Sequence, residues 1–250
     1  MHAVLVLISL IAWPLSAPAV EVMVHSAEAV LGREPREGLE FSAVAQEPQV
    51  VLVEIHRPGT LFIARIDYAR ETVTITSLAP EMGAAAPIMP ADIGAFRRVL
   101  RSIALDRSRV ADALISTLQV LADHPPQAVV DVQTKHSIPP RLAPQVYTSL
   151  CESIGQPVIA QYTINGELVE VLVVIGSCAA NECLGRCGTG CASNPGNPAE
   201  IQRYTQECLN HDACNRATNP QDPLGLFPPC SDEFAAAVEG YFFAPDCPGC

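Results

Sequence analysis

A histidine and an aspartate stand side by side in the segment CLNHDAC, residues 208–214. The ordinary pKa of His211 lies near neutral pH, so its imidazole can take a proton from water. Asp212 offers carboxylate oxygens, which hard cations prefer. In a helix, Cys208, His211 and Cys214 share one surface because they are three residues apart. Asp212 is then rotated by about 100° from His211, so both can line one site.

A glycine-rich segment, RCGTG at residues 186–190, precedes this predicted helix. Glycine allows a loop to turn its carbonyl oxygens inward through backbone angles that other residues resist. Because Ca²⁺ takes oxygen ligands, such a loop together with one carboxylate is a suitable cage. The two segments therefore indicate a calcium site beside a histidine base.

The same region also contains the side chains of a zinc site, because thiolates and imidazole are the usual ligands of Zn²⁺. The candidate ligands are Cys183, Cys187, Cys191, Cys208, His211 and Cys214. A predicted oxidising compartment and an even cysteine count disfavour zinc and favour disulfides.

Together the two segments resemble the secreted phospholipase A2 family. CLNHDAC is similar to its Cys-x-x-His-Asp-x-Cys motif, and RCGTG is similar to its calcium loop, x-Cys-Gly-x-Gly. The resemblance covers residues 178–247, less than a third of the chain. It implies a small, disulfide-rich, mainly α domain that binds Ca²⁺ and hydrolyses an acyl ester of glycerophospholipids.

The resemblance also implies a role for each matching residue. His211 would activate a water as general base, and the carboxylate of Asp212 would bind Ca²⁺. The remaining calcium ligands would be the backbone carbonyls of Arg186, Gly188 and Gly190. Arg186 departs from the family pattern, because a tyrosine is common at its position.

In the family a second aspartate holds the histidine ring in its productive tautomer. Asp232 is the candidate, since it follows a cysteine at the start of a second predicted helix. Ser231 intervenes between that cysteine and Asp232, unlike in the family, so Asp222 and Asp246 remain alternatives.

Disulfide pairings follow from the same resemblance. It implies that Cys187 pairs with Cys208 and so joins the glycine-rich loop to the helix. Cys214 would pair with a cysteine of the C-terminal stretch, either Cys230 or Cys247. The spacing of ten cysteines does not determine the other pairings.

The N-terminus and the cysteine content both predict export. Residues 1–19 contain an apolar run too short to span a bilayer, and Ala17 and Ala19 give a signal-peptidase pattern. Nine of the ten cysteines lie in the last 73 residues, as in a disulfide-stabilised secreted module. The sequence therefore predicts a secreted protein that begins near Val20 and has no transmembrane segment.

The chain has 250 residues and a net charge of −12. This charge argues against a nucleic-acid partner, because binding to phosphates requires clustered lysine and arginine. Nothing in the sequence specifies an oligomeric state.

Residues 20–176 are predicted to form an α+β domain. Residues 20–48 have weak alternation and a charged run, which suggest an exposed lead-in. Apolar and β-branched runs, helical spacing of apolar residues and an Asn-Gly turn define the remaining elements. Strands are expected at 49–55, 61–66, 72–78, 129–132, 158–164 and 168–175, and helices at 92–105, 108–122 and 142–154.

Residues 177–250 are predicted to form the phospholipase A2-like domain. One helix is expected from Pro198 to Ala217, and another from Ser231 with an apolar stripe that includes Phe234 and Tyr241. The resulting hypothesis is a secreted, calcium-dependent, phospholipase A2-like esterase that acts on phospholipid at a membrane or micelle interface. The alternative is a non-catalytic secreted binding module stabilised by the same disulfides.

Overall fold

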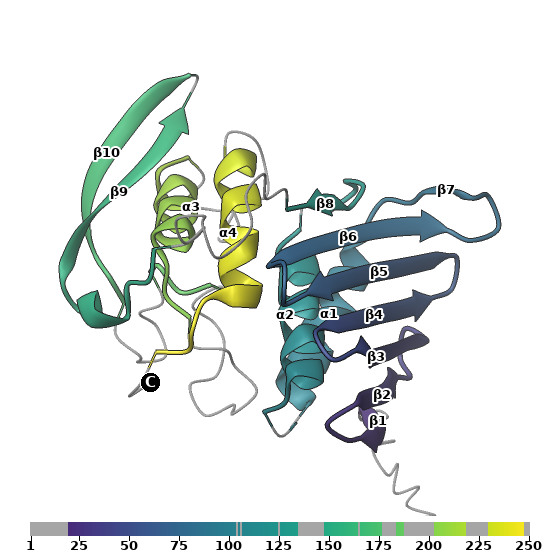
Figure 1. The fold of residues 1–250 in the computed structure, drawn as a ribbon. Helices are drawn as coiled ribbons and strands as arrows, with labels where there is room; N and C mark the ends of the chain where they lie inside the picture. The colour runs from purple at the N-terminus through teal and green to yellow at the C-terminus, as the bar shows by residue number, and fades with distance from the viewer. Residues whose placement is uncertain are drawn as a thin grey trace, which may run out of the picture.

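The structure is a computed structural model that describes most of the chain (Figure 1). The described residues are 20–103, 105, 107–124, 126–134, 148–164, 166–176, 184–187, 203–218 and 230–247. The predicted signal peptide, residues 1–19, lies outside them.

An antiparallel sheet of eight strands forms the N-terminal half (Figure 1). The strands β1 to β7 lie in the sheet in chain order, and β8 pairs with β6. Their bounds are Glu21–His25, Ala29–Glu34, Leu39–Glu47, Val50–Arg57, Thr60–Asp67, Thr72–Ala79, Ala84–Ala85 and Asp131–Gln133. The strands predicted at 49–55, 61–66 and 72–78 correspond to β4, β5 and β6, so this part of the prediction is confirmed.

Two helices, α1 (Pro90–Ser102) and α2 (Arg109–Asp123), pack on one face of this sheet (Figure 1). Alternating strand residues such as Val53 and Ile55 are fully buried beneath them. The hydroxyl of Ser108 caps α2 by accepting a hydrogen bond from the backbone N–H of Ala111 at 3.1 Å. Both helices, and the α+β class of the chain, agree with the prediction.

The expectation of an exposed lead-in at residues 20–48 is wrong for β2 and β3, which have buried residues in the sheet, although every residue of β1 is exposed. Part of the charged run lies at the turn between β2 and β3, while Phe41 is 2% exposed in the core. Glu34 is also buried, since its carboxylate pairs with the guanidinium of Arg98 on α1 at 3.3 Å. Because the two partners are far apart in sequence, the charges near Glu34 alone suggested that this segment is exposed to solvent.

The C-terminal half adds a hairpin and two helices. The hairpin strands are β9 (Pro157–Ile164) and β10 (Glu167–Val174), and the helices are α3 (Gln206–Thr218) and α4 (Ser231–Phe243). Gly166 in the hairpin turn has a φ of 81°, as a tight Asn-Gly turn requires, so the predicted hairpin is confirmed. From one side of the molecule to the other, the layers are hairpin, α3, α4, the α1–α2 pair and the sheet (Figure 1).

The hairpin belongs to a second core formed with α3. Tyr162 of β9 and Leu209 of α3 are both buried in this core. The disulfide between Cys151 and Cys247 spans 96 residues and joins the segment before the hairpin to the C-terminal tail. A domain division at residue 176 therefore separates two segments that pack against each other.

Two helix predictions differ from the structure. In the segment 142–154, residues 142–147 lie outside the described part of the chain, and Cys151–Ser153 form a single 3₁₀ turn. The helix that carries His211 begins at Gln206, and residues 203–205 before it are not helical. Their backbone instead pairs with residues 185–187, a partner that helical spacing does not reveal.

Helix α4 joins the two halves. Its apolar stripe, including Phe234, Ala237 and Tyr241, is buried in the same core as the sheet, as the sequence predicts. It also packs beside α3 (Figure 1). Within the described part of the chain, no helix combines the length and apolar character needed to cross a membrane.

Candidate active site

The start of α3 positions the candidate base and the candidate calcium ligand. Thr205 caps the helix, because its hydroxyl accepts a hydrogen bond from the N–H of Cys208 at 3.2 Å and its carbonyl accepts one from Leu209 at 3.0 Å. The 13 residues of α3 therefore follow in a fixed register, and His211 and Asp212 project from adjacent angles.

His211 faces the interior between α3 and α4. Its side chain is 5% exposed, and its ring lies 5.4 Å from the ring of Phe234 at an interplanar angle of 52°. Burial among apolar groups disfavours the charged imidazolium and lowers the pKa of His211 to about 4. The imidazole is therefore neutral at pH 7, the form that a general base needs before it accepts a proton.

Asn215 is a neighbour of His211 that the sequence interpretation missed. Its amide nitrogen lies 3.3 Å from Nε2 of His211, and its Oδ1 is buried without a hydrogen bond from any described residue. Rotating the amide by 180° brings Oδ1 to Nε2, where Oδ1 can accept a hydrogen bond from the Nε2–H group. Nδ1 then keeps its lone pair, so Asn215 can hold the tautomer required of a base. The i, i+4 spacing of these residues is the signal that could have identified this pair.

The side chain of Asp212 contacts Gly185, the residue just before the glycine-rich segment. Its Oδ2 accepts a hydrogen bond from the N–H of Gly185 at 2.7 Å. Burial is the main cause that raises the pKa of Asp212 to about 7; the negative charge of Asp123 raises it further, and the Gly185 hydrogen bond opposes both. A cation beside this carboxylate would favour its ionised form.

Two hydrogen bonds and a disulfide attach residues 185–187 to α3 and to the residues just before it. The N–H of Cys187 donates to the carbonyl of Arg203 at 2.7 Å, and the N–H of Thr205 donates to the carbonyl of Gly185 at 3.2 Å. The disulfide between Cys187 and Cys208 then links the two segments, with a Cα–Cα distance of 5.3 Å. This is the pairing that the phospholipase A2 resemblance implies.

A second disulfide joins α3 to α4. Cys214 pairs with Cys230, one of the two partners considered from the sequence, and Cys247 pairs instead with Cys151. Cys230 is also the N-terminal cap residue of α4. This bond therefore fixes the first turn of α4, which carries Phe234, beside His211.

Several predicted site residues are not described. Gly188, Gly190 and Asp222 lie outside the described residues, and the side chain of Asp232, on the first turn of α4, is also outside them. Their roles remain predictions. Asp246, the other alternative for the second aspartate, forms ion pairs with Arg107 and Arg203.

In the described part of this region, no cysteine is available as a thiolate ligand for zinc. Cys187, Cys208 and Cys214 are all in disulfides, and no described cysteine is free. The described residues also contain no group of three or more His, Cys, Asp or Glu side chains that could hold a metal ion. A calcium cage built mainly from backbone carbonyls needs no such group.

Gly240 allows α4 to approach the loop disulfide closely. A Cβ at this position would lie 3.0 Å from both Sγ of Cys187 and Oγ1 of Thr205. We expect Gly240→Ala to lower the free energy of unfolding by about 1–3 kcal/mol in urea titrations, because α4 must move away. The control is Gly94→Ala in α1, where the nearest atom is the flexible end of Arg98 at 3.5 Å. The free energy of unfolding of this control should rise by up to about 1 kcal/mol. An equal change in the free energy of unfolding of both variants would contradict the close approach of α4 to the disulfide.

Comparisons with known proteins return no relative. No family model matches the chain, and neither a curated protein nor a solved structure matches it. The function proposed for the chain is therefore inferred from the residues of the site and from their geometry.

Proposed function

We propose that this chain is a secreted, calcium-dependent esterase of the phospholipase A2 type, which hydrolyses an acyl ester of glycerophospholipids at a membrane or micelle interface. One observation carries the proposal: the carboxylate of Asp212, next to His211, accepts a hydrogen bond from Gly185, the residue just before the glycine-rich segment, and the Cys187–Cys208 disulfide joins the start of that segment to the same helix. The candidate base and cation ligand therefore lie beside residues 185–187, and the proposed carbonyl ligands follow directly in the sequence.

The donor chemistry of the site fits Ca²⁺. Asp212 supplies carboxylate oxygen, and its raised pKa reflects the cost of burying that carboxylate. The carbonyl oxygens of Arg186, Gly188 and Gly190 are the other ligands that the family resemblance implies, and oxygen is the ligand atom that Ca²⁺ prefers. When bound, the ion would polarise the ester carbonyl and stabilise negative charge on its oxygen.

The proposed role of His211 is to move a proton. Neutral His211 takes a proton from a water at Nδ1 while the water oxygen bonds to the ester carbonyl carbon. The bond from that carbon to the leaving alkoxide then breaks, and the imidazolium returns the proton to the alkoxide. The products are a fatty acid and a lysophospholipid. Asn215 holds Nε2, and Asp232 is a further candidate for that position.

The experiment is release of fatty acid from phosphatidylcholine vesicles by the oxidised protein, with Ca²⁺ or with a chelator. We expect Ca²⁺-dependent release, and a decrease of about 10²–10⁴-fold in His211→Gln, because the proton acceptor is lost. His56→Gln, on the exposed surface of β4, is the matched control and should keep full activity.

Two results would reject the proposed mechanism. One is His211→Gln that remains folded and fully active. The other is wild-type release that continues unchanged in the chelator, since Asp212 would then have no cation to hold. Sequencing the N-terminus of protein exported from expressing cells tests the secretion part, with Val20 as the expected start.

A second candidate function is a non-catalytic secreted binding module. The observation in its favour is that His211 is only 5% exposed and lies against Phe234. This function predicts no turnover at saturating Ca²⁺. It also predicts that the protein binds vesicles in a sedimentation assay and that reducing the disulfides abolishes this binding.

A further inference from the structure

A polar pocket lies where the two halves of the molecule meet, apart from the elements that hold His211. Its volume is about 430 Å³, within the usual range for small-molecule sites. It is lined by Tyr68, Arg107, Ser108, Arg109, Asp112, Arg203 and Asp246. Three arginines and two aspartates give it an excess positive charge in a chain whose net charge is −12.

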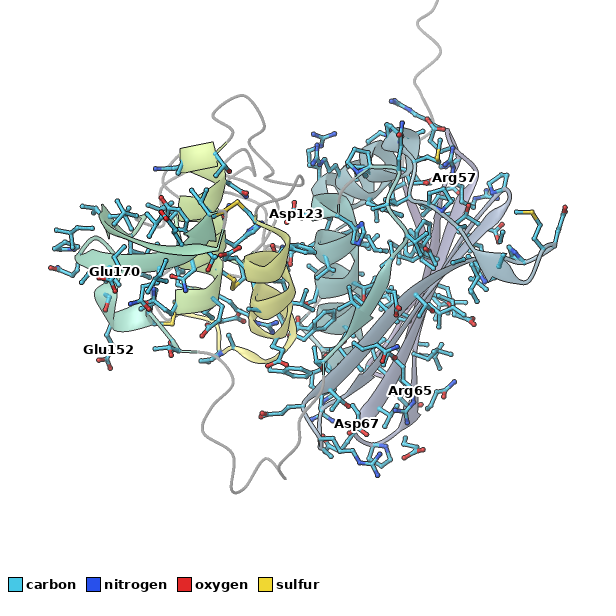
Figure 2. All side chains as sticks on the ribbon, turned by 90° about the horizontal axis from the view of Figure 1, so that it is seen from above. Arg57, Arg65, Asp67, Asp123, Glu152 and Glu170 are labelled. Atoms are coloured by element: carbon cyan, nitrogen blue, oxygen red, sulfur yellow. A yellow bond between two sulfur atoms is a disulfide. The ribbon has the colours of Figure 1, made fainter. Side chains whose placement is uncertain are left out.

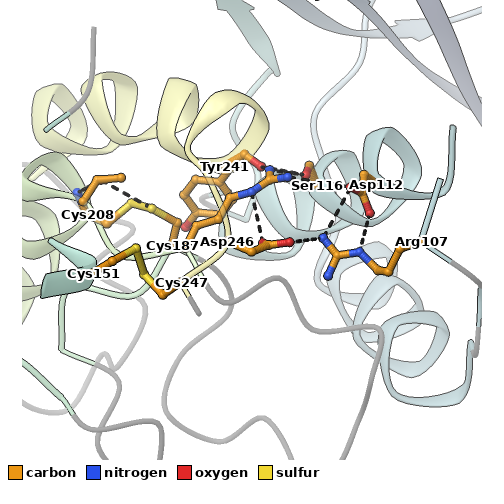
Figure 3. A network of polar contacts seen from close by, with 11 residues as sticks. Arg107, Asp112, Ser116, Cys151, Cys187, Cys208, Tyr241, Asp246 and Cys247 are labelled. Atoms are coloured by element: carbon orange, nitrogen blue, oxygen red, sulfur yellow. Dashed lines mark hydrogen bonds and ion pairs between the residues drawn. A yellow bond between two sulfur atoms is a disulfide. The ribbon is translucent and has the colours of Figure 1, made fainter. Parts of the chain in front are cut away.

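Arg203 and the two aspartates hold the walls of the pocket together. The buried Arg203 guanidinium donates to the carbonyl of Tyr241 and pairs with Asp246 at 3.5 Å and Asp112 at 3.9 Å. Arg107 bonds to Asp112 and to Asp246, as the dashed lines in Figure 3 show. These contacts join α2 to the C-terminal tail, and they leave Nε of Arg203 buried without a hydrogen bond to any described residue.

Arg109 also keeps most of its donors. Its Nη1 donates to the carbonyl of Pro48, and its guanidinium lies 5.2 Å above the ring of Tyr68, which fixes its position. Its Nε and Nη2, and Nη1 of Arg107, donate to no described residue. Arginine N–H groups without acceptors, which line a pocket, are suited to an anion.

The N-terminus of α2 adds to this positive charge. Ser108 is its cap residue and lines the pocket, and Arg109 is the first residue of the helix. The N-terminal end of a 15-residue helix carries a partial positive charge and attracts anions. The arginine donors and this helix end therefore act on the same space.

We propose that this pocket binds a small phosphate-bearing anion, held by Arg109 and Arg107 at the N-terminus of α2. Phosphate is favoured over carboxylate because a carboxylate has two oxygens, which a single guanidinium satisfies. A tetrahedral phosphate has further oxygens for the second arginine and for the helix end. The pocket is separate from the proposed esterase, so this inference does not depend on that activity.

The test is calorimetric titration of the full oxidised chain with inorganic phosphate at constant pH and ionic strength. We expect saturable binding that is about tenfold weaker in Arg109→Gln, because a charge-assisted hydrogen bond is lost. Arg33→Gln removes the same charge from an exposed ion pair on β2 and should bind as the wild type does. Arg109→Lys keeps the charge without the planar fork, and it should bind more weakly than the wild type.

Three results would overturn the proposal: no saturable binding of phosphate, equal affinity of wild type and Arg109→Gln, or acetate that binds as tightly as phosphate. Further titrations identify the source of the phosphate. Tighter binding to glycerol 3-phosphate than to vesicles containing phosphatidic acid supports a soluble phosphate ester, and the reverse order supports a lipid headgroup.

Discussion

Replacing Cys151 and Cys247 together by alanine is expected to lower the free energy of unfolding by about 4 kcal/mol. Their disulfide spans 96 residues, so its removal restores much of the chain entropy of the unfolded state. It also releases the tail that carries Asp246, whose carboxylate pairs with Arg107 and Arg203. In Figure 3 this disulfide lies next to that ion-pair network.

The matched control is removal of Cys214 and Cys230, which span only 16 residues. Loop entropy predicts a smaller loss there, about 3 kcal/mol. Urea unfolding of both double variants and the wild type, without reductant, measures the difference. A larger loss in the Cys214–Cys230 variant would contradict the loop-length explanation. A loss below about 1 kcal/mol in the Cys151–Cys247 variant would show that the tail is held without its disulfide.

The elements that could be predicted from the sequence are those with a strong local pattern. β-branched runs predicted β4 and β6, and apolar residues at helical spacing predicted α2 to within one residue at each end. Asn-Gly predicted the turn between β9 and β10. In each case the pattern and the burial that it implies lie within a few consecutive residues.

The elements that were missed depend on distant partners. Glu34 is buried because Arg98 on another element neutralises it, so its charge misled the local interpretation. The extended residues before α3 pair with residues 185–187, and their sequence alone fits a longer helix. The partner of Cys151 lies 96 residues away, and spacing cannot identify it.

The candidate site likewise has features that the sequence predicted and features that only the structure reveals. The types of His211 and Asp212 indicated a base and a cation ligand. The hydrogen bond from Gly185 and the contact with Asn215 came only from the structure. Gly185 donates through its backbone, which no side-chain pattern can reveal. Burial of His211 by Phe234 likewise depends on how α4 packs on α3.

The other large effect is expected at Asp123, a buried carboxylate at the junction of the two halves (Figure 2). Burial raises the pKa of Asp123 to about 7, although Tyr241 donates a hydrogen bond to its Oδ2 at 3.0 Å. Its position at the C-terminal end of α2, where the helix dipole is negative, also disfavours the charge. Oδ1 has no hydrogen-bond partner among the described residues.

The direction of the pH effect follows from this raised pKa. In the unfolded chain the carboxyl ionises near its ordinary value of 3.8, whereas in the folded chain it stays protonated up to about 7. Its contribution to stability is therefore complete below pH 3.8 and is lost as the pH rises through 7. We expect Asp123→Asn to stabilise the protein by about 2–4 kcal/mol at pH 8 and to have little effect at pH 3.5.

Urea unfolding at both pH values measures this change, and Asp67→Asn is the control. Asp67 is equally buried, but its Oδ1 accepts hydrogen bonds from the N–H groups of Ala69 and Arg70, and the guanidinium of Arg70 lies 3.6 Å from Oδ2. Asp67→Asn should therefore destabilise the fold at pH 8, because a partnered charge is lost. If the Asp123→Asn variant is less stable than the wild type at pH 8, the negative charge of Asp123 must be compensated in the folded protein. The junction between the halves would then be held by that charge, and a protonated carboxyl would play no part in it.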